Sequence, residues 1–272
     1  MRELVATRKE DPSLLRTRIE TDGYVLIRGC VDPGTVERLA VAVETIIDDL
    51  GLRSAPDVVE AFRATRTPFY RALQRRAEFH EPTTDAQLRG SLQHIIGPEL
   101  FAHPRRLLRT IPPGAPALVT PAHQDFTYIG GSADTFTVWM PLRACEPDSG
   151  ALRILVGSHA DGPQPHAARD AVAGSGVDVD DDDPRWAGTA FAPGDVVIFH
   201  SLTVHGGLPN RSSRWRLSAD YRFQSTSDPV DPRSLLPSGH PAVPDWPELL
   251  AGTDWDRERL VGISPGLGIT AG

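Results

Sequence analysis

The sequence predicts a mainly β fold, an antiparallel sandwich or barrel that follows a helical N-terminal part. Two observations carry this prediction. Up to about residue 100, apolar residues recur mostly at three- and four-residue steps, which is the period of an amphipathic helix. Beyond that point, short apolar or alternating runs are separated by clusters of Gly, Pro and Asp, which is typical of antiparallel strands joined by turns.

The N-terminal part begins with one expected strand, over residues 22–29, where a β-rich run is bracketed by glycines. A helix is expected over 33–50, because Pro33 suits a first helical turn and the apolar period ends at a glycine. Residues 56–81 also give an amphipathic stripe, despite the interruption at Pro68. The first third of the chain is therefore expected to be mainly α.

Seven further strands are expected in the second part of the chain. The last of them alternates cleanly, with Leu217 among the apolar residues of one face and Arg216 and Ser218 on the other. After it, from Ser227 onward, a Pro- and Gly-rich tail is expected to wrap the core as coil, with one short helix near residues 246–250. The seven strands are placed near residues 105–111, 117–122, 134–142, 151–156, 188–192, 195–200 and 214–224.

A single domain is the expected organisation. A length of 272 residues is above the usual size of one domain, but all-β sandwiches and barrels often reach it undivided. We expect a helical N-terminal part over about 1–100, a β core over about 101–226 and a C-terminal wrap over 227–272. Because 40% of the residues are hydrophobic, such a domain can build a sizeable core.

Charge and hydropathy argue against several partners. The formal net charge is −8, and no run of Lys or Arg extends beyond pairs such as Arg75-Arg76, so neither nucleic acid nor a membrane is an expected partner. No stretch approaches the ~18 apolar residues that span a bilayer, and the N-terminus lacks the apolar region of a signal peptide. A cytoplasmic location is therefore expected, with Cys30 and Cys145 as small buried thiols.

The longest irregular stretch covers residues 159–187 and is acidic. It holds Asp178 and four consecutive aspartates at 180–183. Carboxylates bind calcium, but the spacing differs from that of an EF-hand loop and no Glu closes it. A solvated acidic insert is therefore favoured over a calcium loop.

The residues that point to chemistry begin with His123-Gln124-Asp125. On an extended backbone, residues two apart point to the same side, roughly 6.5–7 Å apart, so His123 and Asp125 can converge on one metal ion. A third ligand is available at His205, where an apolar segment that follows the Gly194 turn ends. Two histidines and one carboxylate form the facial triad of non-haem Fe(II) oxygenases, which leaves positions open for a co-substrate and O₂.

Arg216 fits the demand that a 2-oxoglutarate co-substrate makes. When this molecule chelates iron through its keto and C1 carboxylate oxygens, its C5 carboxylate needs a fixed cation. Arg216 lies on the next strand, eleven residues after His205, and a planar guanidinium can bind a carboxylate through two parallel hydrogen bonds. This arginine can point to the metal if the polar face of its strand is the inner one.

These motifs, in this order, resemble the phytanoyl-CoA dioxygenase (PhyH) family of Fe(II)- and 2-oxoglutarate-dependent oxygenases. The resemblance runs from about Asp22 to Gln224. It implies a double-stranded β-helix, a jelly-roll or cupin-like core buttressed by N-terminal helices. It rests on His123-Gln124-Asp125, Gly150-Ala151-Leu152, Gly157-Ser158-His159, Gly194-Asp195, His205, Asn210, Ser212 and Arg216.

The resemblance also implies roles for single residues. The implied roles are iron ligands for His123, Asp125 and His205, and contacts to 2-oxoglutarate for Arg216 and Thr137. One position departs from the family, because some relatives have a serine two residues after the distal histidine where this chain has Gly207. Relatives that halogenate carry a small residue in place of the carboxylate, so Asp125 favours hydroxylation or a related oxidation.

The expected reaction is oxidation, most simply hydroxylation, of a C–H bond in a small organic molecule of specialised metabolism, with O₂ consumed and succinate and CO₂ released. Desaturation, ring closure and epimerisation share the same starting chemistry and stay open, as does the oligomeric state. Phe126, Tyr128 and Trp139 either line the substrate pocket or belong to the core. Arg109 and Arg143 either anchor an anionic substrate or form surface ion pairs.

Two alternatives of different classes stay open. One is a jelly-roll isomerase or hydrolase that uses the same triad with zinc or manganese, which would leave Arg216 without a task. The other is a metabolite-binding protein of the same fold without turnover. The remaining histidines are expected to be structural, as for His159 and His200, or to lie in loops and on the surface, as for His80, His94, His103, His166 and His240.

Overall fold

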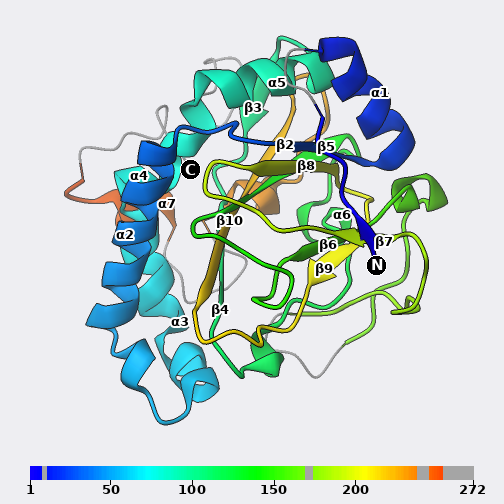
Figure 1. Cartoon of the computed structure of the whole chain (residues 1–272). Coiled ribbons are helices and arrows are strands. Elements are labelled where there is room, and N and C mark those ends of the chain that lie inside the picture. The colour runs from blue at the N-terminus through cyan, green and yellow to red at the C-terminus, as the bar shows by residue number, and fades with distance from the viewer. Residues whose placement is uncertain (8–10, 169–173, 238–244, 254–272) are drawn as a thin grey trace.

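The computed structural model describes residues 1–7, 11–168, 174–237 and 245–253. The chain forms three layers, in which helices cover one face of a large sheet and a smaller sheet faces the other (Figure 1). The helices are contributed mainly by the first hundred residues, and most of the strands by the residues that follow. The mainly β part preceded by helices is therefore confirmed as two sheets with an N-terminal helical layer.

The large sheet has six strands. Its order is β2 (Tyr24–Ile27), β8 (Val196–His200), β5 (Thr135–Pro141), β10 (Arg216–Ser225) and β3 (Leu100–Ala102), and β4 (Leu107–Ile111) pairs with β10 as well. Each of these pairings is antiparallel. The central pair sets the register, because Arg222 of β10 lies opposite Thr137 of β5 and Ser218 opposite Pro141.

The small sheet has four strands, in the order β1 (Arg2–Glu3), β7 (Trp186–Gly188), β6 (Leu152–Leu155) and β9 (His205–Gly207). Its strand β9 brings a histidine to the face that looks towards the large sheet. The two sheets meet through apolar side chains from both, among them Leu26, Trp139 and Phe199 of the large sheet and Leu152 and Ile154 of the small one.

The helical layer consists of α1 (Pro12–Asp22), α2 (Pro33–Asp49), α3 (Val58–Gln74), α4 (Ala77–His80) and α5 (Ala86–Ile96). Aspartates cap four of the five, since Asp11, Asp32, Asp57 and Asp85 each accept a hydrogen bond from a backbone N–H of the first turn. The apolar stripes of these helices bury themselves against the outer face of the large sheet, to which β10 contributes Leu217, Ala219, Tyr221 and Phe223.

The inner face of β10 is polar throughout. Arg216, Ser218, Asp220, Arg222 and Gln224 alternate with the apolar residues, and all five are buried. The alternation therefore places a polar row between the two sheets, as the sequence requires if Arg216 is to face a metal site.

Several element boundaries were predicted well. The expected elements over 22–29, 33–50, 134–142, 151–156, 195–200 and 214–224 correspond to β2, α2, β5, β6, β8 and β10. The short helix expected near 246–250 is α7 (Trp246–Leu250), and α3 continues through Pro68. The rest of the expected C-terminal wrap falls partly outside the described residues.

One expected strand was wrong. Residues 117–122 include part of a 3₁₀ turn at Pro116–Leu118 and no strand, because Pro121 has no N–H to donate to a ladder. The strand expected at 188–192 lies earlier, as β7 (Trp186–Gly188). Six α-helices and strands were not expected from the sequence: α1, α5, the short helix α6 (Phe126–Ile129), β1, β3 and β9. Strand β9 contains two glycines and forms through its pairing with β6, which local propensity does not show.

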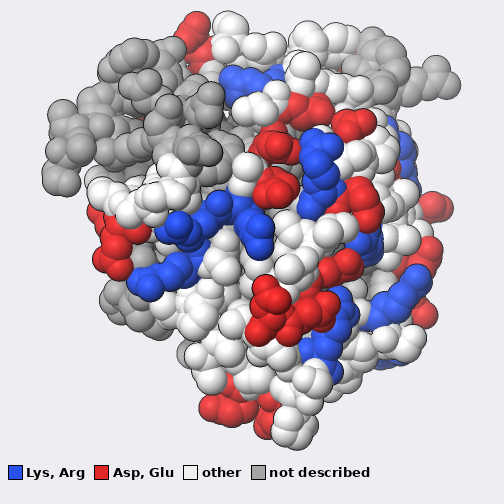
Figure 2. All heavy atoms as spheres, turned by 90° about the vertical axis from the view of Figure 1, so that its left-hand side faces the viewer, with Lys and Arg blue, Asp and Glu red and all other residues white. Residues whose placement is uncertain are grey.

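The burial of the cysteines and the distribution of charged side chains agree with what the composition predicted. Both cysteines are buried thiols outside any disulfide among the described residues. Within the acidic stretch, Asp181 is exposed and pairs with Arg153, as expected of a solvated insert. Figure 2 shows acidic and basic side chains interspersed over the helical face. No helix among the described residues is long and apolar enough to span a membrane.

Candidate metal centre and co-substrate site

The metal centre is built where a loop pairs with β9. His123 and His205 exchange two backbone hydrogen bonds, of 2.9 and 3.0 Å, as an isolated bridge. Gly206 permits this approach, because a Cβ there would lie 3.2 Å from the backbone nitrogen of Ala122. The two histidines are therefore paired across the strand and the loop, whereas we expected His123 and Asp125 on one extended strand. Asp125 instead has helical angles, φ −64° and ψ −29°, at the start of α6.

Three potential ligands converge on one point. Donor atoms of His123, Asp125 and His205 all lie within 4.8 Å of one another, and each residue is at most 4% exposed. The Nδ1 atoms of the histidines are engaged, His123 with the carbonyl of Pro121 and His205 with the carbonyl of Thr203, both at 2.9 Å. A neutral histidine that donates from Nδ1 presents a free lone pair at Nε2, so both rings are prepared to bind a metal.

The Asp125 carboxylate is held at both oxygens. Thr137 Oγ1 donates to Oδ2 across 2.5 Å, and Arg222 Nη2 donates to Oδ1 across 3.0 Å. Burial alone would raise the pKa of Asp125, but Arg222 and the two histidines hold it well below its usual range. The carboxylate is thus ionised, oriented and available as a metal ligand.

Burial also sets the protonation state of His205. Together with the neighbouring His123, it lowers the pKa of His205 to about 3. The ring is therefore neutral at physiological pH, which is the form that binds a metal.

Neighbouring residues fix the loops that carry these ligands. The Gln124 side chain is buried, donates to the carbonyls of Gly162 and Leu202, and accepts from the N–H of Gln164. Ser158 accepts a hydrogen bond from the backbone N–H of Val204, directly before His205. The middle residue of the His-x-Asp motif and the serine of the Gly-Ser-His segment thereby act as structural supports.

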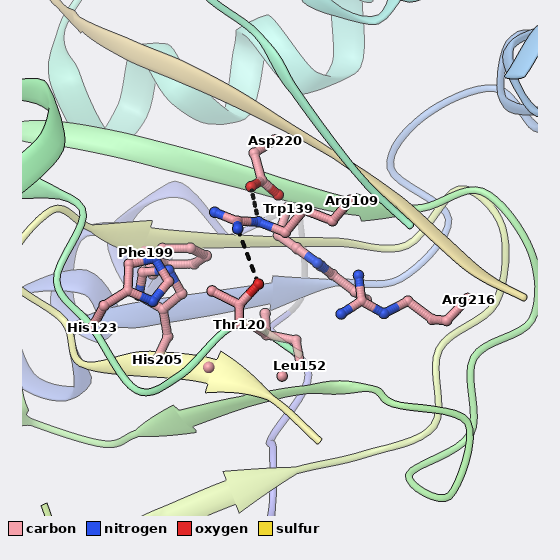
Figure 3. Close-up of a pocket in the computed structure, with 11 residues that line it drawn as sticks. Arg109, Thr120, His123, Trp139, Leu152, Phe199, His205, Arg216 and Asp220 are labelled. Carbon is pink, nitrogen blue, oxygen red and sulfur yellow. Dashed lines mark hydrogen bonds and ion pairs between the residues drawn. The ribbon is translucent and has the colours of Figure 1, made fainter. Parts of the chain in front are cut away.

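A narrow cavity extends from the metal ligands to Arg216 (Figure 3). Arg216 Nε donates to the carbonyl of Gly150 at 2.8 Å and Nη1 to Ser218 Oγ at 2.6 Å. Its Nη2 lies 3.3 Å from the place that a Cβ on Gly207 would occupy. Burial lowers the pKa of Arg216 to about 10, so the side chain stays protonated at neutral pH.

Asn210 and Ser212 stabilise the turn before β10, since Asn210 donates to the carbonyls of Ile111 and Arg214 and accepts from Ser212.

A second arginine lines the same cavity. Arg109 donates to Asp220 Oδ2 at 2.7 Å and to Thr120 Oγ1 at 3.0 Å, as the dashed lines of Figure 3 mark. Burial disfavours its charge, but Asp220 and Asp125 raise its pKa above the ordinary value. Asp220 thus balances Arg109, and Asp125 balances Arg222. Among the residues that the structure describes, Arg216 is the cation of the polar row without a carboxylate partner.

The other expected site residues are distributed differently. Trp139 lines the narrow cavity and packs on Phe191, whereas Tyr128 stands beside His123 with its ring edge-on, 5.7 Å between centroids. Phe126 is half-buried and does not line the narrow cavity. Thr137 touches Asp125 and does not line the narrow cavity. Arg143 pairs with Glu44 and Glu37, as in the surface ion-pair alternative.

The other histidines of the described residues lie outside the metal centre. His159 contacts the carbonyl of Glu20, and His200 pairs with Asp134. The expectation of a surface or loop position was wrong for His80, which is buried in α4, whereas His103 lies in the loop between β3 and β4 but is buried there. His103 is hydrogen-bonded to Gln224 at the end of the polar row. His240 lies outside the described residues.

Two histidines, one carboxylate and a buried arginine between two sheets define the class of non-haem iron oxygenases. The family model of phytanoyl-CoA dioxygenase (PhyH) matches residues 19–218, and the chain belongs to this family. It is accordingly a 2-oxoglutarate-dependent dioxygenase, with iron, 2-oxoglutarate and O₂ as cofactors.

Individual relatives agree with this class. The chain is 26% identical over 258 residues to 1-deoxypentalenic acid 11-beta-hydroxylase of Streptomyces exfoliatus, an alignment that covers 88% of this chain and 87% of that protein. The solved structure of the non-heme monooxygenase ThoJ gives a TM-score of 0.61 at 18% identity, with 79% of each chain covered. The epimerase SnoN, solved with Fe³⁺, alpha ketoglutarate and nogalamycin RO, gives 0.55 at 18% identity, with 90% of this chain and 93% of that one covered. The two structures show a shared fold.

Several residues of the site were not found from the sequence. Arg222, Asp220 and Thr120 contact metal or cavity residues, but no local motif includes them. One signal was present for the first two, because the alternation that places Arg216 on the inner face places Asp220 and Arg222 there as well.

Proposed function

We propose that this protein hydroxylates a C–H bond of a small organic molecule of specialised metabolism. In this proposal His123, Asp125 and His205 hold Fe(II), and Arg216 binds the C5 carboxylate of 2-oxoglutarate. The observation that carries it is one buried cavity lined by both histidines of the triad and by an arginine with no carboxylate partner among the described residues.

The donor set fits Fe(II). Two imidazole nitrogens and a carboxylate on one side of the ion suit this metal and leave its opposite side open. Iron and 2-oxoglutarate, when bound, supply the activation of O₂ for C–H oxidation, and 2-oxoglutarate leaves as succinate and CO₂. The residues of the chain contribute the rest: Thr137 and Arg222 fix the carboxylate, the carbonyls of Pro121 and Thr203 fix the rings, and the surrounding apolar residues limit water.

The arginine fits the co-substrate. Arg216 is buried and positively charged, and its Nη2 points past Gly207, where no side chain intervenes. A serine in place of Gly207, as in some relatives, would put its Cβ 3.3 Å from that nitrogen, which is closer than ordinary van der Waals contact, so the Arg216 side chain would have to shift slightly. The cavity has a volume of only about 10 Å³, so 2-oxoglutarate has to displace neighbouring side chains when it binds.

Hydroxylation is the outcome that the residues favour within this class. Asp125 retains the carboxylate that halogenating relatives lack, and the Streptomyces exfoliatus relative is named a hydroxylase. The sandwich around the metal ligands supports the jelly-roll topology that we expected. Its large sheet is antiparallel, and its small sheet is antiparallel except for the parallel β1–β7 pair.

Next to the metal centre, a second and larger cavity offers room for the substrate. It has a volume of about 430 Å³, and its lining includes His123, Asp125, Tyr128 and Arg109. This volume is in the range of pockets that bind small organic molecules. Arg109 and Thr120 line both cavities, so the co-substrate and the substrate would meet at the metal.

Anaerobic reconstitution tests the proposal. Addition of Fe(II) and then 2-oxoglutarate to metal-free protein should produce the weak visible charge-transfer band of the chelate. The band should be absent in His205→Ala and retained in His200→Ala, a histidine outside the triad. Iron binding without the band would refute the role of 2-oxoglutarate and favour the isomerase alternative.

A further inference from the structure

The larger cavity combines an apolar wall with an excess of positive charge. Its apolar lining comes from α3 and from the stretch around β4, as Phe62, Phe69, Tyr70, Leu107, Leu108 and Leu118. The hydroxyl of Tyr70 is already used, because it donates to the carbonyl of Leu108. This wall therefore offers a hydrocarbon surface, and a ligand that covers it gains by removing apolar area from water.

Four arginines line the same cavity against one carboxylate. They are Arg66, Arg105, Arg109 and Arg222, and the carboxylate is the proposed iron ligand Asp125. Arg109 is balanced by Asp220, and Arg222 by Asp125. Arg105 is bonded to the backbone carbonyls of Arg233 and Leu236.

Two of these arginines lack a carboxylate partner. Neither Arg66 nor Arg105 has an ion pair among the described residues. Burial and the neighbouring Arg222 lower the pKa of Arg105 to about 10, which reflects the crowding of positive charge. An anion bound here would relieve that repulsion.

Arg222 supplies a further unused donor. Its side chain is 4% exposed, and its Nε is buried without a hydrogen-bond partner although Nη2 contacts Asp125. A buried N–H of a guanidinium that lacks an acceptor is costly, so an acceptor that a ligand brings to Arg222 would stabilise this side chain.

We propose that the substrate is a free carboxylic acid with a hydrocarbon body, and that Arg105 and Arg222 bind its carboxylate. This inference rests on the proposed function and names the substrate class of that site. The apolar wall holds the body, and the cationic end fixes which C–H bonds face the metal. An ester or thioester of the same acid lacks the charge that the arginines bind.

In this proposal the substrate carboxylate and 2-oxoglutarate bind at separate sites. Arg216 lines the narrow cavity only, whereas Arg105 and Arg222 line the larger one only. Arg216 and Arg222 are six residues apart on β10, so they are separated by about 20 Å along that strand. Two carboxylates can therefore be bound at once, one at each cavity.

The test compares three ligands with one hydrocarbon body: farnesoic acid, its methyl ester and farnesol. Calorimetric binding is measured anaerobically on the full chain loaded with Fe(II) and saturating 2-oxoglutarate, and the charge-transfer band is recorded in the same samples. The acid should bind at least about ten-fold more tightly than the ester and the alcohol. The band should persist, because the acid does not compete for Arg216.

Substitutions localise the effect. Arg105→Gln should remove most of the preference for the acid, and Arg105→Lys, which keeps the charge, should retain part of it. The matched control is Arg75→Gln, because Arg75 also bonds backbone carbonyls of the C-terminal segment, at Leu249 and Ala251, but does not line the cavity. The control should keep the full preference.

The contrary outcomes are distinct. Equal binding of the three ligands, no binding of the acid at millimolar concentration, or a preference unchanged in Arg105→Gln would overturn the inference. Loss of the band on addition of the acid would also overturn it, because the acid would then occupy the co-substrate site. If the band never forms without any acid, the proposed function itself fails.

Discussion

Arg222 donates from Nη2 to Oδ1 of Asp125 across 3.0 Å, and the two residues are 97 positions apart in the chain. The pair is nearly excluded from solvent, with exposed fractions of 4% and 1% for the two side chains. An ion pair of this kind keeps the carboxylate charged where burial would favour its protonated form. Arg222 therefore contributes to the metal centre although it has no contact with the metal position.

The first prediction concerns this pair. Arg222→Gln should weaken Fe(II) binding by about 10- to 100-fold, because Asp125 loses the partner that lowers its pKa. Its pKa then rises, so protons compete with iron more strongly as pH falls, and the deficit should be larger at pH 6 than at pH 7.5. Anaerobic Fe(II) titration at both values measures this. Arg153→Gln, which removes a cation paired with Asp181 instead, is the control.

Thr137 gives a second prediction. Thr137→Val keeps the shape of the side chain but removes the hydrogen bond to Asp125 Oδ2, so Fe(II) affinity should fall by roughly ten-fold. Thr137→Ser keeps the hydroxyl and should bind iron nearly as the wild type does. Equal affinity of the Val variant and the wild type would show that the hydroxyl does not position the ligand.

The third prediction concerns the co-substrate. Arg216→Lys should raise the KM for 2-oxoglutarate by at least about ten-fold, because an ammonium group cannot form two parallel hydrogen bonds with a carboxylate. Fe(II) affinity should stay near that of the wild type. Steady-state succinate release at varied 2-oxoglutarate measures the change. Arg214→Lys, on the exposed residue just before β10, should leave KM as it is; an unchanged KM in Arg216→Lys would move the C5 carboxylate elsewhere.

The fourth prediction concerns pH and His103. Burial lowers the pKa of His103 in the folded protein from 6.5 to about 4. Between these values the unfolded chain binds a proton that the folded chain does not, so the free energy of unfolding should fall as pH drops from about 6.5 to 4. The loss from this residue is as much as about 3 kcal/mol. Urea denaturation of metal-free protein at pH 7 and pH 5 should show a smaller difference for His103→Gln than for the wild type.

The sequence predicted β10 and its role because one strand alternates over its full length. Apolar residues alternate with polar ones from Arg216 to Gln224, and only one orientation buries the apolar face against helices. The same logic failed at residues 117–122. There a 3₁₀ turn and Pro121 take the place of the expected strand, and an isolated bridge follows at His123, so the backbone of His123 and Asp125 differs from the extended geometry we expected.

The residues that contact the triad and Arg109 could not be predicted from the sequence, for a physical reason. Arg109 of β4 donates to Thr120, and Arg222 of β10 donates to Asp125; both acceptors lie outside the strands, and no spacing in the chain encodes these contacts. Which side chains meet is fixed by the register of β10 against β4 and β5, and register depends on the packing of the whole sandwich. A sequence motif can identify the metal ligands, but it cannot identify the residues that orient them.

One face of strand β10 packs against the helical layer, and the other face contributes the polar row to the metal and co-substrate sites. Core packing and the site therefore cannot change independently on this strand. A single-residue deletion in β10 would exchange the faces, moving Tyr221 and Phe223 into the polar interior and the arginines into the core. Changes in substrate choice are easier at the lining residues of the larger cavity outside this strand, which come mainly from α3 and the stretch around β4. Substitutions at those lining residues can change the substrate that is bound while the metal ligands stay the same.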